Sequence, residues 1–140
     1  MLRQLQHSLP IRASRPGLHE ITDSVASWVA KCGIGSGLLT LFCRHTSASL
    51  VIQENAAPAA RRDLERYFEK IAPQSPAAYE HDDEGPDDMP AHLRTALTAT
   101  SLSIPVSNGR LALGTWQGIY LFEHRQSTPE REIVLHLVGE

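Results

Sequence analysis

The chain has 140 residues, a formal net charge of −3 and 41% hydrophobic residues. This length predicts one domain, residues 1–140, with a core of its own, and no apolar run approaches the ~20 residues that a membrane-spanning helix requires. The lack of basic blocks argues against nucleic-acid binding, and an N-terminus unlike a signal peptide predicts a cytoplasmic protein. Cys32 and Cys43 show no C-x-x-C spacing and are expected to be partly buried thiols.

The first half of the chain predicts strands and two helices. Residues 3–11 alternate between apolar and polar side chains, as a half-buried strand does. Apolar residues at spacings of three and four predict the helices, the first ending at Gly33 and the second starting near Pro58. The elements expected in order are a strand at 3–11, a helix at 21–32, a strand at 37–45, a strand or tight connection at 47–55, and a helix at 58–71.

The second half predicts a long loop, a short helix and strands. Pro73 and Pro76 open a loop that runs to Asp88, and loops of this length in a compact domain are usually functional. Pro90 is expected to start the short helix, and Asn-Gly suits a tight hairpin turn between two later strands. The strands are expected at 101–106, 110–124 and 131–139. The predicted fold is therefore α+β: a single compact domain with an antiparallel sheet, two main helices and a short one.

The long loop carries most of the negative charge. Six of the nine residues in Glu80–Asp88 are acidic, so this segment contributes −6 and the rest of the chain +3. Carboxylates at this density repel one another unless cations neutralise them. Gly85 and Pro86 restrict the backbone, and His81 and His92 flank the charge, which favours a binding loop over the alternative of a flexible, solvated one.

Three histidines are candidate metal ligands and catalytic residues. His45 ends a predicted apolar strand, and folding could bring it together with His81 and His92. Three imidazoles form a known zinc set with an open position for water or a substrate oxygen, whereas carboxylates suit Mg²⁺ shared with a phosphate. The sequence offers both ligand types, so the divalent metal is expected to be Mg²⁺ or Zn²⁺. Taken singly, each histidine is interpreted as a hydrogen-bonded structural residue, and the case for a metal site rests on the three together.

Other polar residues are candidates for binding a phosphorylated small molecule. Thr46 and Ser47 follow a predicted strand, where hydroxyls and backbone N–H groups bind phosphate, although ordinary turn hydrogen bonds are the alternative. An aromatic ring beside an amide, Trp116 and Gln117, could stack on and recognise a flat heterocycle, or be part of the core. Bidentate phosphate contacts could come from Arg94, Arg110 and Arg125, unless these form surface ion pairs.

Four segments carry a resemblance that extends over essentially the whole chain. They are "RHTSASLVIQEN", "YEHDDEGPDDMPAHLR", "SLSIPVSNGRLALGTWQGIYLFEHR" and the terminal "VGE". The chain closely resembles the YjbQ-like family, whose members are described as secondary thiamine-phosphate synthases. In one motif this chain reads "QENAAP", so Ala57 stands where the family commonly has a carboxylate.

The resemblance implies a function, a set of residues and an assembly. It implies a homotrimer that joins a thiazole phosphate to an aminopyrimidine diphosphate and releases pyrophosphate, with a divalent metal and arginines stabilising the departing charge. The family motifs place His45, His81 and His92 at the metal or substrate site, with Glu84 as a further catalytic candidate and Asp87 and Asp88 as metal candidates. The alternatives are a histidine-metal hydrolase of zinc type and a non-catalytic module that binds a phosphorylated metabolite.

Overall fold

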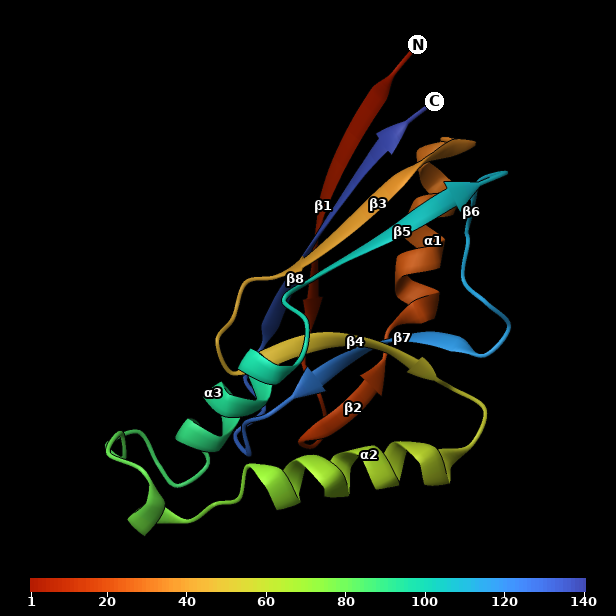
Figure 1. The fold of residues 1–140 in the computed structure, drawn as a ribbon. Helices are drawn as coiled ribbons and strands as arrows, with labels where there is room; N and C mark the ends of the chain where they lie inside the picture. The colour runs from red at the N-terminus through yellow and green to blue at the C-terminus, as the bar shows by residue number, and fades with distance from the viewer.

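The chain folds into strands that form two sheets and helices that cover them (Figure 1). The computed structural model describes residues 1–140, apart from the side chain of Pro76. In chain order the elements are β1 (Arg3–Ile11), β2 (Gly17–Glu20), α1 (Thr22–Cys32), β3 (Ser36–Cys43), β4 (Ala48–Glu54), α2 (Pro58–Ile71), the 3-10 helix η1 (Pro76–Ala78), α3 (Asp88–Leu97), β5 (Ser101–Ser107), β6 (Arg110–Leu111), β7 (Gln117–Glu123) and β8 (Arg131–Gly139). None of the described helices is long and apolar enough to span a membrane.

All strand pairs are antiparallel and fall into two sheets. The larger sheet has the order β1-β8-β3-β5-β6, and the smaller has the order β2-β7-β4. The interior strand β8 alternates between buried and half-buried residues along its length, because successive side chains of a strand point to opposite faces. A single bridge between Leu50 and Ala99 joins the smaller sheet to the segment that leads into β5.

The core lies between the two sheets and α1. Its buried side chains come from β3, β4, β5, β7 and β8, and Val25 and Val29 of α1 pack into the same cluster. A second, smaller cluster lies on the opposite side of the three-stranded sheet, where Leu64 and Phe68 of α2 cover Tyr120 and Phe122. The smaller sheet is therefore buried on both faces, whereas no helix covers the outer face of the larger sheet in Figure 1.

The expected α+β domain with two main helices and a short one is confirmed. Residues 3–11 form β1 and residues 58–71 form α2, within the expected bounds. Gly33 ends α1 in a left-handed conformation with a φ of 69°. The hairpin between β5 and β6 turns at Asn108 and Gly109, which have positive φ angles of 53° and 73° as a tight hairpin turn requires.

The expected strand at 110–124 is wrong. β6 ends at Leu111, and β7 starts only at Gln117, in the other sheet. Two hydrogen bonds hold the intervening segment in place. Gly114 N donates to the Gln117 side-chain carbonyl at 2.8 Å, and Asn55 N donates to Trp116 O at 3.0 Å. The chain therefore leaves one sheet and enters the second, and the expectation of one sheet becomes two.

Two smaller expectations also change. The strand β2 was not expected, because its four residues come directly after a turn signal. They pair with the end of β7. The short helix α3 starts at Asp88 instead of Pro90, so the acidic loop ends inside its first turn. This places Asp88 and His92 one helical turn apart on the same face of α3.

Candidate metal centre

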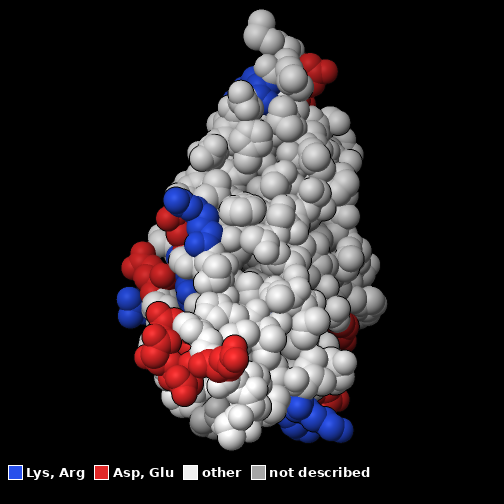
Figure 2. Space-filling model, turned by 60° about the vertical axis from the view of Figure 1, so that its left-hand side comes forward, with Lys and Arg blue, Asp and Glu red and all other residues white. Residues whose placement is uncertain are grey.

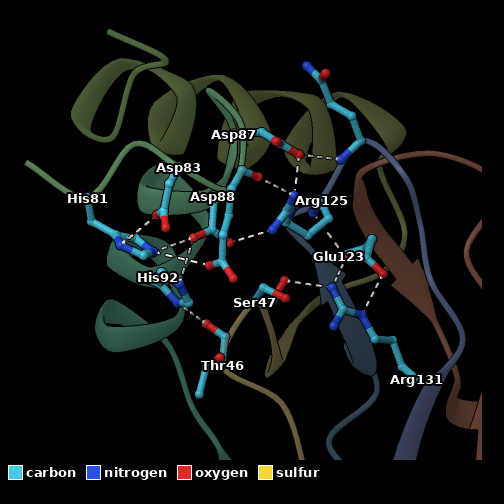
Figure 3. Close-up of polar contacts among 12 residues, drawn as sticks. Thr46, Ser47, His81, Asp83, Asp87, Asp88, His92, Glu123, Arg125 and Arg131 are labelled. Carbon is cyan, nitrogen blue, oxygen red and sulfur yellow. Dashed lines mark hydrogen bonds and ion pairs between the residues drawn. The ribbon is translucent and has the colours of Figure 1, made fainter. Parts of the chain in front are cut away.

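Four side chains converge where the acidic loop meets α3 (Figure 3). His81 and Glu84 come from the loop, and Asp88 and His92 come from α3. One ligand atom from each of the four lies within 4.8 Å of all the others. Asp88 is buried, with 3% of its surface exposed, whereas His81 and Glu84 are exposed to solvent.

The distances between the ligand atoms suit a shared cation. The Nε2 atoms of His81 and His92 each lie 3.0 Å from Asp88 Oδ2, and His81 Nε2 lies 3.2 Å from Glu84 Oε2. Zinc binds imidazole nitrogen and carboxylate oxygen at about 2.0–2.2 Å, so neighbouring ligand atoms of a tetrahedral site lie roughly 3.3–3.5 Å apart. These three contacts would lengthen by only about 0.3 Å to reach this geometry.

The tautomer of His92 orients its second nitrogen toward the cluster. His92 Nδ1 lies 2.9 Å from the backbone oxygen of Thr46, which can only accept, so Nδ1 carries a proton and donates it. In neutral His92 the Nε2 atom then carries a lone pair, and this lone pair faces a carboxylate oxygen. That contact is favourable only when Nε2 binds a second proton or a metal ion. Histidine metal ligands characteristically donate their other N–H to a backbone carbonyl or a carboxylate in this way.

His81 has a similar environment. Its Nδ1 atom lies 3.4 Å from Asp83 Oδ1, and its Nε2 atom faces Glu84 and Asp88. The hydrogen bonds with Glu84 and then Asp88 raise the pKa of His81 above its ordinary value. In this structure the carboxylates therefore favour a positive charge at the position where the two imidazoles meet.

Arg125 holds the acidic loop from the end of β7. Its Nη1 atom donates to Asp88 Oδ1, and Nη2 donates to the backbone oxygen of Glu84 at 3.0 Å. Its Nε atom donates to Asp87 Oδ2 at 3.1 Å, an oxygen that also accepts the backbone N–H of Gln126. Burial alone would raise the pKa of Asp88, but Glu84, His92 and Arg125 outweigh it and hold this pKa below its ordinary value.

These contacts correct two expectations. Asp87 was a metal candidate, but its carboxylate is used by Arg125 and by Gln126, and it is not a member of the four-residue cluster. Arg125 was a candidate for binding phosphate, but its guanidinium is occupied by Asp87, Asp88 and Glu84. Arg125 instead holds the Asp88 carboxylate, and Asp87 holds Arg125.

His45 does not join the other two histidines in the cluster. Its Nε2 atom accepts the backbone N–H of Glu132 at 2.8 Å, so this nitrogen is not free to bind a metal. Burial, and next the charge of Arg131, lower the pKa of His45 below its ordinary value, and the neutral ring carries its proton on Nδ1. The expected three-histidine set is therefore replaced by two histidines and two carboxylates.

A cavity of about 640 Å³ borders His92. Its wall presents hydrogen-bond donors: Arg44, His45, Thr46 and Thr95 line it, and no carboxylate does. The hydroxyl of Thr95 is buried and has no hydrogen-bond partner among the described residues. Thr46 was predicted as a binding residue and lies in this wall, whereas sequence reasoning missed Thr95, which only the fold of α3 places here.

The other predicted binding residues lie elsewhere. Ser47 uses its backbone oxygen to accept from Arg131 Nη2 at 3.0 Å, and Arg94 lines a separate cavity. Arg110 lies in β6, and the Gln117 side chain closes the turn before β7, both far from α3 in Figure 1. Trp116 is 63% exposed in the same turn. The structure therefore does not bring Arg110, Trp116 and Gln117 to the candidate centre.

Comparison with known proteins identifies the family. The model of the family described as "UPF0047 protein YjbQ-like" matches residues 7–140. The chain belongs to this family. A UPF0047 protein of Synechocystis is 49% identical over 138 residues, which cover 99% of this chain and 94% of that protein. The UPF0047 protein YjbQ of Escherichia coli O157:H7 is 44% identical over 136 residues, which cover 96% of this chain and 98% of that protein.

Solved structures agree with the fold. A crystal structure from Sulfolobus solfataricus P2, described as a YbjQ-like protein of unknown function, has a TM-score of 0.91 and 26% identity and covers 100% of both chains. A hypothetical protein from Aeropyrum pernix K1 has a TM-score of 0.86 and 28% identity, with 97% of this chain and 99% of that chain covered.

The same comparisons correct the expected function. The sequence was expected to specify a thiamine-phosphate synthase, but the family and these relatives carry UPF0047 names, the Sulfolobus structure is described as being of unknown function, and none of these proteins is named a thiamine-phosphate synthase. That function is therefore withdrawn. The expectation that the protein is an enzyme is tested by none of these names and stays a prediction.

Proposed function

We propose that this protein binds one divalent metal ion of the zinc class through His81, Asp88 and His92, with Glu84 as a further ligand, and that the ion helps to bind a small phosphorylated molecule. The observation that carries the proposal is the contact between His92 Nε2 and Asp88 Oδ2, at 3.0 Å, in a ring whose other nitrogen already donates to Thr46 O. A metal ion between these two atoms satisfies both lone pairs at once.

The ligand types favour a zinc-class ion over Mg²⁺. Two imidazole nitrogens with carboxylates suit zinc and its neighbours in the first transition row, whereas Mg²⁺ prefers oxygen ligands and keeps several waters. Of the two expected cofactors, the cluster therefore supports Zn²⁺. Arg125 contributes by holding Asp88 Oδ1, which leaves Oδ2 turned toward both histidines.

The neighbouring cavity supports a phosphorylated ligand. Its volume of about 640 Å³ lies within the range of small-molecule pockets. The Nδ1–H of neutral His45 and the hydroxyls of Thr46 and Thr95 supply donors, and Arg44, whose Nη1 atom pairs with Glu132 at 3.2 Å, adds a guanidinium to the wall. A phosphate group could bind both to these donors in the cavity and to a metal ion on His92.

Calorimetry with phenyl phosphate tests this function. The titration compares metal-stripped protein with zinc-loaded protein. We expect binding only after zinc is loaded, and no zinc-dependent binding in His92→Gln. The matched control is His19→Gln, which changes a histidine of β2 outside the site. Thr95→Val should keep zinc and weaken phenyl phosphate roughly ten-fold, the value of one hydrogen bond to a charged group. Equal binding by stripped and loaded protein would contradict the proposal.

A further inference from the structure

A second cavity, of about 320 Å³, lies between the end of α2, α3 and the end of β7. Glu69, Gln74, Arg94 and His124 line it. It shares no lining residue with the 640 Å³ cavity and contains no member of the four-residue metal cluster. A smaller cavity of about 80 Å³ continues past Glu69 and Arg94 toward Glu123.

A chain of hydrogen bonds determines the tautomer of His124, which is buried with 2% of its surface exposed. Thr98 Oγ1 lies 2.8 Å from the backbone oxygen of Arg94, which can only accept, so Thr98 donates there. The contact between Thr98 and Ser49 hydroxyls, at 2.5 Å, then requires Ser49 to be the donor. The remaining contact, 2.9 Å between Ser49 Oγ and His124 Nε2, therefore requires Nε2–H to donate.

The second nitrogen of His124 is consequently an acceptor without a donor. Burial, and next the charges of Arg94 and Arg131, lower the pKa of His124 to about 3, so the ring is neutral at pH 7 and Nδ1 keeps its lone pair. This Nδ1 atom is buried and has no hydrogen-bond partner among the described residues. A buried polar atom left unpaired costs free energy, which a ligand group that donates a hydrogen bond would recover.

Two opposite charges complete the lining. Arg94 Nη2 donates to the backbone oxygen of Ala72 at 2.8 Å, but its Nε–H is buried and has no partner in the described part of the chain. Glu69 is exposed on the last turn of α2. Neither Glu69 nor Arg94 forms an ion pair with another described residue.

We infer that this cavity is a second ligand site, specific for a small zwitterion with an ammonium and a carboxylate group, the chemical class of the free α-amino acids. The ammonium group donates to His124 Nδ1 and is attracted by Glu69, and the carboxylate accepts from Arg94 Nε. A hydroxyl compound or a simple anion would satisfy only part of this set, because the site offers one acceptor, one anion and one cation. The inference is independent of the metal centre.

Saturation-transfer NMR and calorimetry with L-serine as the probe test this site in the full-length protein. Ethanolamine and acetate are the matched probes that carry only one of the two charged groups. We expect saturable binding of L-serine, with the dissociation constant raised roughly ten-fold or more by Arg94→Met or by Glu69→Gln, each of which removes one charge-assisted contact. Asp63→Asn, an exposed change on the same helix, should leave binding unchanged.

His92→Gln should also leave L-serine binding unchanged, which separates this site from the metal centre. The inference is overturned if L-serine shows no saturable binding, as when a water molecule alone fills the cavity. It is also overturned if ethanolamine or acetate binds as tightly as L-serine, or if Arg94→Met and Glu69→Gln both bind as the unchanged protein does while circular dichroism shows them folded.

Discussion

Two histidines of this chain are held in opposite tautomers by their neighbours. His92 donates from Nδ1 to a backbone carbonyl, and His124 donates from Nε2 to Ser49. The first arrangement aims Nε2 at a carboxylate, where a positive charge is favourable, and the second buries a ring beside two arginines, where protonation of the ring itself is unfavourable. The same residue type therefore has two different protonation preferences because its neighbours differ.

The buried neutral ring of His124 predicts that acid destabilises the fold. Its folded pKa of about 3 lies below the ordinary 6.5, so the unfolded chain binds the proton more tightly and stability falls as the pH is lowered from 6.5 toward 3. The loss from this residue should be about 2 kcal/mol at pH 5. Urea unfolding of the protein and of His124→Gln at pH 7 and pH 5 measures it. The variant should lose less stability between the two pH values, and equal losses would refute the assignment.

At the scale of elements, the end of β7 connects the core to the candidate centre. Glu123 is 1% exposed and pairs with Arg131 of β8, whose Nε lies 2.8 Å from Glu123 Oε1. Glu123 Oε2 also accepts the backbone N–H of Arg125, and Arg131 donates to the backbone oxygen of Ser47. This buried ion pair therefore fixes both the arginine that holds Asp88 and the segment whose Thr46 orients His92 (Figure 3).

Removal of one partner of this pair should be costly. Arg131→Met leaves the carboxylate of Glu123 buried without a cation, which is expected to lower the free energy of unfolding by about 3 kcal/mol. The double variant Glu123→Gln and Arg131→Met removes the uncompensated charge and should recover part of that loss. Urea denaturation of the two single variants and the double variant gives the coupling energy. A double variant whose loss equals the sum of the single losses would show that the two residues are not coupled.

The sequence predicts elements whose signal is local and misses features that depend on distant partners. The bounds of β1 and α2 follow from alternation and from Pro58 at a helix start. The break between β6 and β7 does not, because Asn55 pairs with Trp116 across the fold. At the candidate centre His81, Asp88 and His92 could be predicted from the acidic loop. The sequence could not predict that His45 is excluded from the cluster. Its Nε2 atom accepts the backbone N–H of Glu132, a residue far along the chain.

At the scale of the whole molecule, the outer face of the five-stranded sheet is uncovered and partly apolar. Leu38 and Phe42 of β3 are 42% and 46% exposed on it. In the strand register, Leu38 lies beside Val138 and Phe42 beside Val134, and both valines are half-buried. Figure 2 shows a group of acidic side chains at the lower left of this view, with others at its edges, next to a wide area without charged side chains. Such a surface is typical of an interface between protein chains.

The expected homotrimer stays a prediction, and this face is where we expect copies to meet. Sedimentation of the unchanged protein should give a species larger than a monomer. The double variant Leu38→Glu and Phe42→Glu should sediment as a monomer, because each carboxylate would have to be buried at the interface. Tyr67→Glu on α2, where the side chain is 57% exposed, is the matched control and should keep the assembly. A monomeric unchanged protein would contradict the prediction.

The claim on which the function depends is that one metal ion lies between His81, Asp88 and His92. Anomalous diffraction at the zinc edge, from crystals of zinc-loaded protein, tests it most directly. We predict one dominant peak about 2.0–2.2 Å from His81 Nε2, His92 Nε2 and Asp88 Oδ2, and no peak there in His92→Gln. Zinc found only at other positions, or a peak of unchanged height in the variant, would contradict the account.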